Sequence, residues 1–247
     1  MNQMAKLTWV ETKLQFRDWG TVAFGLLLPS VLLVVLAFAY PGFRDPVPEL
    51  GGLRPVDVYT PIVLVLALVM IGISAIASVL ATYRHDGILK RLRTTPVGPA
   101  RLLAAQLLAQ LLVATVGAAL AVVAALTVLD VVPPRSWLGV LAGLLLGATS
   151  LFGIGLVIGA LASSTSVANA IASVTWMPIM LLAGLWFPRD AMPAAMRRVS
   201  DFSPGGAGAD AMQQAWFEGV VPTSSLGVLA AFALVTGGIA ALTFRWD

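Results

Sequence analysis

Six long stretches without an ionisable residue constrain the fold of this chain more than any other feature. An α-helix rises about 1.5 Å per residue, so about 20 apolar residues cross the ~30 Å hydrocarbon layer of a bilayer. We therefore predict an all-α, polytopic membrane protein with six transmembrane helices. The stretches, each of at least 20 residues, are Thr21–Tyr40, Val58–Thr82, Leu102–Leu129, Trp137–Ala162, Val167–Phe187 and Pro222–Phe244.

The composition of these stretches also bears on the energy source. Carriers that are driven by protons or ions usually hold acids, bases or His at membrane depth, because those groups titrate or pair there. None of the six stretches contains Asp, Glu, Lys, Arg or His. We therefore expect the driving force to come from outside the bilayer.

The bulk composition excludes a water-soluble core. Of the 247 residues, 59% are hydrophobic and 11% are charged, whereas soluble domains carry about 25% charged residues. Cys is absent, which excludes a disulfide framework or a thiolate metal site. The basic pI of 9.7 suits anionic lipid headgroups better than nucleic acid, because the basic residues flank the spans. We expect one membrane domain over residues 1–247.

The distribution of basic residues predicts the orientation. The 15 Lys and Arg residues divide nine to six in favour of the side that holds both termini and the loop between the second and third spans. Because Lys and Arg are retained in short cytoplasmic loops, we expect both termini in the cytoplasm of a bacterial cell, with the protein in its plasma membrane. Ala37–Ala39 resembles a signal-peptide cleavage site, but the preceding apolar run is too long, so we expect the first span to be retained.

Residues 1–18 predict an amphipathic helix at the membrane interface. Met4, Leu7, Val10 and Leu14 fall on one arc, while Trp9 and Phe16 lie on the opposite side. This pattern suits a helix that contacts lipid on one side and protein on the other. The alternative is an ordinary juxtamembrane helix with no further role.

Small residues recur in the fourth span at helical spacing. Glycines four apart share one helix face and allow close approach of another helix. The pattern favours packing within the chain over a seam between two copies, although the motif alone names no partner. These glycines are Gly139, Gly143, Gly147, Gly155 and Gly159.

The segment 188–221 predicts two short helices on the outer side. They span Ala191–Val199 and Ala207–Phe217, and Ser203–Gly206 is expected to separate them. The Met and Trp side chains of these helices would be exposed to water on a simple loop. Two re-entrant half-helices that dip into the outer leaflet would bury them and could form an outer gate or cap. In the fifth span, Met and Trp could line an adaptable apolar cavity or face lipid.

The loop after the second span carries the most distinctive motif. In Tyr83–Pro99, an acid and a glycine precede a short run with one apolar side and one basic side, bracketed by prolines. We expect a short helix parallel to the membrane, opened by Asp86 and Gly87. The alternative is a basic loop that only sets the topology.

The order of these elements resembles the type-2 ABC transporter permeases, in particular the daunorubicin-exporter-like group. The acid-Gly-x-Leu-x-Arg-Leu-x-x-x-Pro loop carries the resemblance, together with Gly184–Pro188 and the following Met192-Pro193. Two departures are His85, where the family often has Glu, and Ser203-Pro204, where it often has Asn-Pro.

The resemblance implies a membrane subunit that pairs with a second permease copy, or a related permease, and with cytoplasmic ABC ATPase subunits. It implies that the loop 83–100 holds the ATPase-coupling helix, with Arg84, His85, Asp86, Gly87, Ile88, Leu89, Lys90, Arg91, Leu92 and Arg93 as its contacts. The substrate path would follow the second and fifth spans, with Met70, Asn169, Thr175, Trp176, Met177 and Met180 as lining. The outer gate would comprise Phe187, Pro188, Met192, Pro204, Met212 and Trp216.

The chain lacks the Gly-x-x-x-x-Gly-Lys-[Ser/Thr] loop that binds nucleotide phosphates, because none of its three Lys residues follows a Gly. We therefore expect no cofactor on this chain, no enzyme activity, and ATP with Mg on the partner subunit. The expected activity is outward movement of a hydrophobic drug or lipid, as in antibiotic efflux.

Three alternatives stay open from the sequence. One is an ion- or proton-coupled carrier, and another is a membrane module for assembly or immunity that transports nothing. A membrane enzyme is the weakest, because the only His is His85, on a loop, and no paired acids face a predicted cavity.

Overall fold

The computed structural model describes residues 3–87, 99–186 and 188–243, and the described part contains helices and no strand. Six of its helical units are long and apolar enough to cross a membrane, as predicted. The spans are Thr21–Ala39, Pro55–His85, Arg101–Val128, Trp137–Leu161, Thr165–Ala183 and Thr223–Thr243. The helices are α1 (Gln3–Arg17), α2 (Leu28–Ala39), α3 (Pro55–Val69), α4 (Ile76–His85), α6 (Pro99–Val128), α7 (Trp137–Leu161), α8 (Thr165–Ala183), α9 (Ala194–Asp201), α10 (Pro204–Gln213) and α11 (Thr223–Thr243).

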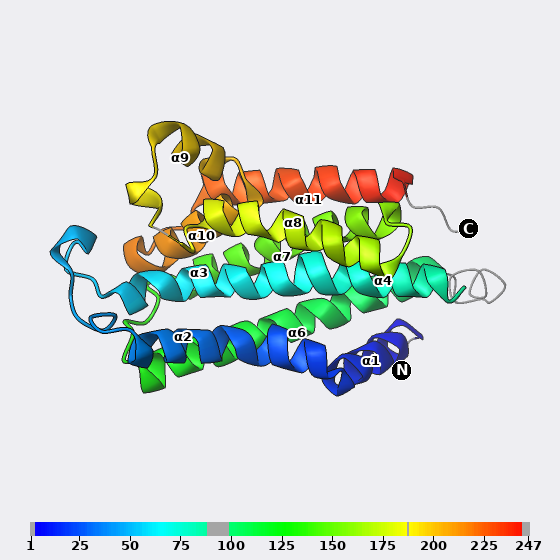
Figure 1. The fold of residues 1–247 in the computed structure, drawn as a ribbon, viewed down its shortest axis with the longest axis horizontal. Coiled ribbons are helices and arrows are strands. Elements are labelled where there is room, and N and C mark those ends of the chain that lie inside the picture. Colours follow the sequence, from blue (N-terminus) through cyan, green and yellow to red (C-terminus); the bar gives the residue numbers. More distant parts are fainter. Residues whose placement is uncertain (1–2, 88–98, 187, 244–247) are drawn as a thin grey trace.

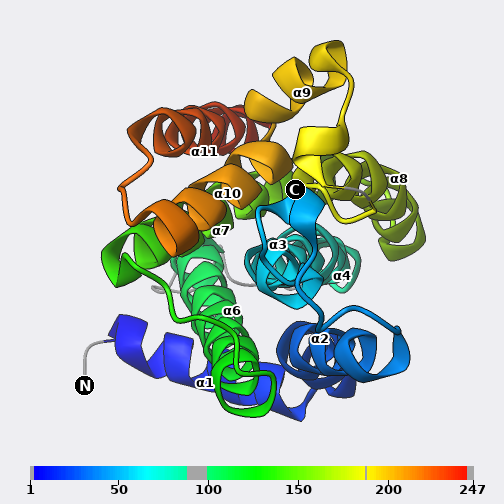
Figure 2. The same ribbon diagram turned by 90° about the vertical axis from the view of Figure 1, so that its left-hand side faces the viewer.

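The second span is the centre of the bundle (Figure 2). In the most apolar part of this span, 72% of the residues are buried inside the protein. The corresponding share for α11, at the periphery, is 11%. The large side chains of Leu64, Leu68 and Ile73 are fully buried there. Every other span, apart from α11, packs on some part of this central helix. A movement of the second span would therefore displace its contacts with most of the other spans.

The glycine-rich face of α7 is used for packing within the chain. A Cβ on Gly155 would lie 1.9 Å from the carbonyl oxygen of Gly72 in the second span. A Cβ on Gly153 would lie 2.0 Å from Oγ1 of Thr236 in α11. Only glycine permits these approaches, so the structure favours the packing interpretation of the motif.

Two spans contain π-helical turns that the sequence did not predict. One covers Thr21–Leu27, directly before Pro29, whose ring nitrogen cannot donate to the carbonyl four residues earlier. The other covers Met70–Ala75 and joins α3 to α4. The two segments are in contact, since a Cβ on Gly25 would lie 3.1 Å from Cγ1 of Ile71.

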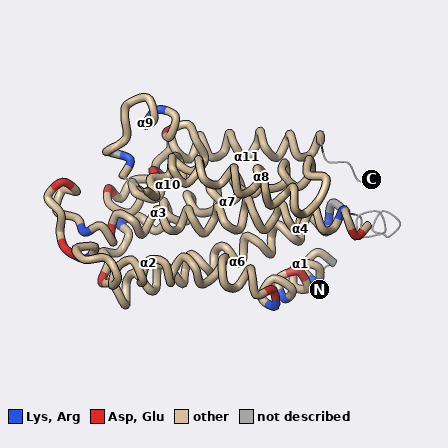
Figure 3. Tube along the Cα trace, viewed as in Figure 1, with Lys and Arg blue, Asp and Glu red and all other residues tan. Residues whose placement is uncertain are grey.

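The charged residues gather at the two ends of the bundle, and the middle is free of them (Figure 3). We call one end the terminal end, because α1 begins there and α11 ends there (Figure 1). The end of α4 and the start of α6, which flank residues 88–98, lie at this same end. The opposite end carries α9 and α10, and we call it the cap end. An even number of spans returns the chain to the end where it began. The start of α1 and the end of α11 at one end of the bundle therefore agree with six spans.

Candidate functional site

A groove lies where the two π-helical segments meet α8. Its volume is about 480 Å³. The groove brings together Met70 and Asn169, two of the predicted pathway residues from distant parts of the sequence. Its lining comprises Asp18, Gly20, Thr21, Phe24, Gly25, Met70, Ile71, Ser74, Ala75 and Asn169.

The other predicted pathway residues on α8 do not line this groove. The Thr175 hydroxyl donates to the carbonyl of Ile171 at 2.7 Å, within its own helix. Trp176 stacks on Trp186 with ring centroids 6.0 Å apart. Met177 is exposed and Met180 is fully buried in the core. The five predicted residues of α8 therefore do not share one side of the helix, and only Asn169 meets Met70 of the second span in the groove.

A polar strip on α8 borders the groove. Ser166, Asn169 and Ser173 are all exposed and recur at a spacing of three or four residues, which places them on one helix face. The Ser173 hydroxyl donates to the carbonyl of Asn169 at 2.8 Å. Such a strip is unfavourable against lipid tails, which offer no hydrogen-bond partner.

The predicted coupling segment is described only in part, because Ile88, Leu89, Lys90, Arg91, Leu92 and Arg93 lie outside the described residues. The prediction that Asp86 and Gly87 begin a helix stays a prediction, because the residues that would form it lie outside the described part of the chain. Within that part, Asp86 and Gly87 end α4. Asp86 donates its N–H to the carbonyl of Thr82, and Gly87 adopts the left-handed φ of 67° that terminates many helices. Tyr83 belongs to α4 rather than to a loop. His85 and Asp86 are exposed at the terminal end.

Arg84 turns into the bundle and binds the end of α7. Its Nη1 donates to the carbonyls of Gly159, Ala160 and Ala162, at 3.3, 2.6 and 3.2 Å. A guanidinium at a helix C-terminus pairs with the negative end of the helix dipole and satisfies its free carbonyls. Arg84 thus ties the end of the second span to the end of the fourth.

Helix α1 packs on the bundle through its polar side. Glu11, Thr12 and Gln15 are each about 5–6% exposed, and the Tyr83 hydroxyl donates to Oε2 of Glu11 at 3.1 Å. The apolar side chains on the rest of the helix are exposed, namely Trp9, Val10, Leu14 and Phe16. Helix α1 therefore contacts the protein through its polar side, which the sequence did not predict, and its contact with lipid stays a prediction.

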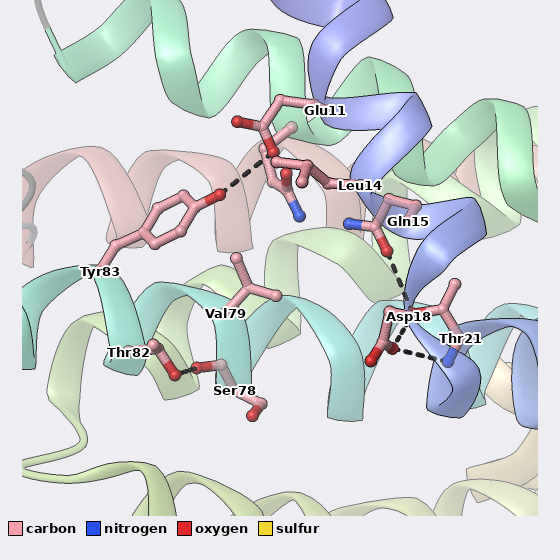
Figure 4. Close-up of a pocket in the computed structure, with 10 residues that line it drawn as sticks. Glu11, Leu14, Gln15, Asp18, Thr21, Ser78, Val79, Thr82 and Tyr83 are labelled. Carbon is pink, nitrogen blue, oxygen red and sulfur yellow. Dashed lines mark hydrogen bonds between the residues drawn. The ribbon is translucent and has the colours of Figure 1, made fainter.

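A second cavity, of about 190 Å³, lies between α1, α4 and α6 (Figure 4). We call it the terminal cavity. Burial raises the pKa of Glu11 above its ordinary value, and the hydrogen bond from Tyr83 partly opposes this change. The cavity is lined by Glu11, Leu14, Gln15, Asp18, Thr21, Ser78, Val79, Thr82, Tyr83 and Gln106.

Sequence reasoning missed Gln106 and Gln110 of α6. Both are buried, at 4% and 0% exposure, and neither amide has a hydrogen-bond partner in the described part of the chain. Two amides four residues apart in an apolar span were the available signal, since they share one helix face. A criterion based on ionisable residues does not include Gln, because an amide carries no charge.

The cap end is held by a network around Arg189, which is 7% exposed. Its guanidinium donates to Asp201 at 2.5 Å, to Asp210 at 2.8 Å and to the Ser200 hydroxyl at 3.1 Å. Asp210 also accepts a hydrogen bond from Ser225 at the start of α11. We call the segment 188–218 the outer cap.

The predicted gate residues in the outer cap are packed into the protein. Met192, Met212 and Trp216 are at most 6% exposed, and the Trp216 indole N–H donates to the carbonyl of Val132 at 2.7 Å. Pro188 is partly buried, and Phe187 lies outside the described residues.

The expected break between the two short helices is present, but it falls at Phe202 and Ser203, and Pro204–Gly206 form the first turn of α10. The Ser203 hydroxyl accepts the N–H of Gly206 at 3.0 Å, and Pro204 occupies the first turn, where its missing N–H costs nothing.

One comparison with known proteins identifies the chain. A family model described as ABC-2 type transporter matches residues 2–217, from α1 through the outer cap. No curated protein matches the chain. The family match covers most of the 247 residues. The chain therefore belongs to the ABC-2 type transporter family and is a membrane permease of an ABC transporter rather than its catalytic subunit.

Proposed function

We propose that this permease is the membrane half of an ATP-driven exporter that moves a hydrophobic, drug- or lipid-like molecule out of a bacterial cell by alternating access. It acts with a second copy or a related permease, as the daunorubicin-exporter-like proteins are expected to do. ATP and Mg bind to a separate cytoplasmic ATPase subunit. In this proposal the terminal end faces the cytoplasm.

The observation that carries the proposal is the groove beside the polar strip of α8. The groove joins Met70 to Asn169, and Ser166 and Ser173 extend the polar surface along the helix. A second permease that faced this side would cover the strip and close the groove into a path through the membrane. Apolar walls with a few polar groups are typical of sites for drug-sized molecules.

The route of force from the ATPase begins at the terminal end. His85 and Asp86 are exposed there, and residues 88–93 continue the proposed docking segment. A push on this segment would move α4, and the contact of Arg84 with the end of α7 would carry the movement to the fourth span. The π-helical segment Met70–Ala75 interrupts the regular hydrogen bonds of the second span beside the groove, and such segments are frequent at functional sites.

The test of the path is export from cells and drug-stimulated ATP hydrolysis after co-purification with the ATPase. Asn169→Trp should fill the groove and abolish both activities while leaving the purified amount unchanged. The matched control is Val174→Trp, because Val174 is 74% exposed on the same helix and does not line the groove. Equal activity of the two variants would contradict the proposed path.

The test of the coupling segment is the pair Leu89→Asp and Leu92→Asp. Both variants should insert normally and lose transport-linked ATP hydrolysis, because a charged side chain would disrupt an apolar contact with the ATPase. Export from proteoliposomes that hold a proton gradient and no ATP would instead support the ion-coupled alternative.

A further inference from the structure

The terminal cavity is a second site, separate from the proposed substrate groove. It lies where α1, the start of the first span, the end of α4 and the start of α6 meet (Figure 4). Its volume of about 190 Å³ exceeds the roughly 10–15 Å³ that a single water needs. It is therefore large enough for a small polar group together with water.

The charge of the cavity lining is negative. Glu11 and Asp18 both line it, and among the described residues no Lys or Arg does. One oxygen of Glu11 accepts from Tyr83, and one oxygen of Asp18 accepts from the backbone N–H of Thr21 at 2.7 Å. Burial is the first cause of the raised pKa of Glu11, and within the described ranges the hydrogen bond from Tyr83, rather than a cation, opposes it. A buried carboxylate in this position gains stability when a cation enters.

Gln106 supplies an independent indication of a ligand. It lines the cavity, is only 4% exposed, and neither its Oε1 nor its Nε2 has a partner among the described residues. Buried amides are almost always hydrogen-bonded, because an unpaired one has lost its contacts with water. A ligand that donates to Oε1 would satisfy the amide oxygen, and water in the cavity could accept from Nε2.

We propose that the terminal cavity binds the protonated amine of a primary ammonium compound, with Glu11, Asp18 and Gln106 as acceptors. An ammonium group carries three N–H donors and no acceptor, which matches two carboxylates and one amide oxygen. A quaternary amine has no N–H to donate, and a phosphate would be repelled by both acids. The described residues hold no group of three metal-ligating side chains, so a divalent metal fits less well.

The position of the cavity suggests where the amine comes from. The cavity lies at the ends of the first three spans, which is the level of lipid headgroups. Exposed apolar side chains of α1 flank it, and Leu14 both lines the cavity and is 53% exposed. An aminophospholipid could place its ammonium group in the cavity, with its phosphate outside, and its acyl chains against this side of α1. A soluble primary amine carries the same donor chemistry.

The test compares thermal unfolding of the full chain in nanodiscs of phosphatidylcholine with and without phosphatidylethanolamine or phosphatidylglycerol. We expect phosphatidylethanolamine alone to raise Tm. For one site in a chain of this size, a lipid concentration of about ten times the Kd should raise Tm by about 3–6 °C. Gln106→Leu should lose this rise while unfolding no earlier than the wild type in pure phosphatidylcholine. The matched control is Gln110→Leu, which removes an equally unpaired amide that does not line the cavity and should keep the rise.

A second variant guards against a folding defect in the first. Glu11→Gln keeps an acceptor for Tyr83 and should also lose the rise in Tm. Stabilisation by phosphatidylethanolamine and not by ethanolamine in detergent assigns the site to a lipid, and stabilisation by both assigns it to any primary amine. An equal rise in Tm with phosphatidylethanolamine and with phosphatidylglycerol would overturn the proposal. So would a full rise in Tm for Gln106→Leu with phosphatidylethanolamine.

Discussion

The outer cap and the terminal cavity each hold two carboxylates, one of them exposed and the other at least partly buried, but the two sites differ in how this charge is paired. At the cap end, Asp201 and Asp210 share the guanidinium of Arg189. At the terminal end, the part of the chain that the structure describes places no Lys or Arg beside Glu11 and Asp18 in the cavity. The cap network is complete within the chain and serves stability, whereas the cavity is left to be completed by a ligand.

Removal of Arg189 should have the largest effect on this contrast. Arg189→Leu would leave Asp201 and Asp210 without their cation and the Ser200 hydroxyl without one partner. Loss of one partner from a buried ion pair costs about 3–5 kcal/mol, and the partial exposure of both acids reduces the expected cost to about 2–4 kcal/mol. Thermal unfolding in nanodiscs should show an earlier transition.

Two further variants separate charge from geometry in the cap. Arg189→Lys keeps the charge but cannot reach three acceptors with a planar fork, so it should recover only part of the lost stability. Arg198→Gln removes an exposed cation of α9 and should leave the transition unchanged. A normal transition in Arg189→Leu would show that the network has no structural role.

Replacement of a glycine by Ala should cost more stability in the outer cap, at Gly206, than beside the terminal cavity, at Gly20. A Cβ on Gly206 would lie 2.1 Å from the carbonyl oxygen of Ser200, and such overpacking costs about 1–3 kcal/mol. A Cβ on Gly20 would lie 3.3 Å from Oδ2 of Asp18, an atom of a movable side chain. Gly20→Ala should therefore stay within about 1 kcal/mol of the wild type, helped by the higher helix propensity of Ala. Equal losses in the two variants would contradict the difference in packing between the ends.

The six spans could be predicted because lipid demands uninterrupted apolar sequence, whatever the tertiary contacts are. The glycine face of α7 was predictable for a similar reason, since small residues four apart permit close packing of helices. The ends of the helices were less predictable. The sequence does not reveal that Asp86 and Gly87 end α4, because the positive φ of Gly87 depends on the course of the backbone.

The polar contacts that distinguish the two ends were beyond sequence reasoning. Arg84 pairs with carbonyls about 75 positions away, and Arg189 pairs with acids 12 and 21 positions away. Neither spacing follows a helix period, so local patterns carry no sign of them. Gln106 became a candidate only after the structure placed it beside Glu11 in one cavity.

The hydrogen bond from Tyr83 to Glu11 should contribute less than either cap feature. Tyr83→Phe would remove the donor and leave the aromatic packing, at a cost of about 1–2 kcal/mol for a bond to an acidic group that is mostly buried. The loss should appear as easier proteolysis at α1, because this bond links α1 to α4. Tyr59→Phe is a matched control at the cap end, since the Tyr59 hydroxyl donates no hydrogen bond within the described residues. Unchanged proteolysis of Tyr83→Phe would exclude this link as an anchor of α1.

The smallest effect should come from Glu11→Gln, and its sign should be opposite to the others. Burial raises the pKa of Glu11 above 4.5. As the pH rises past 4.5, the unfolded chain therefore loses this proton first, and the wild type becomes less stable until the folded-state pKa is passed. Gln carries no such penalty and still accepts from Tyr83, so the variant should match the wild type near about pH 4 and exceed it slightly at neutral pH. Thermal unfolding across this pH range, in phosphatidylcholine nanodiscs, measures the difference. A variant that is less stable than the wild type at neutral pH without an amine present would mean that the chain itself compensates the charge, and the contrast between the two ends would disappear.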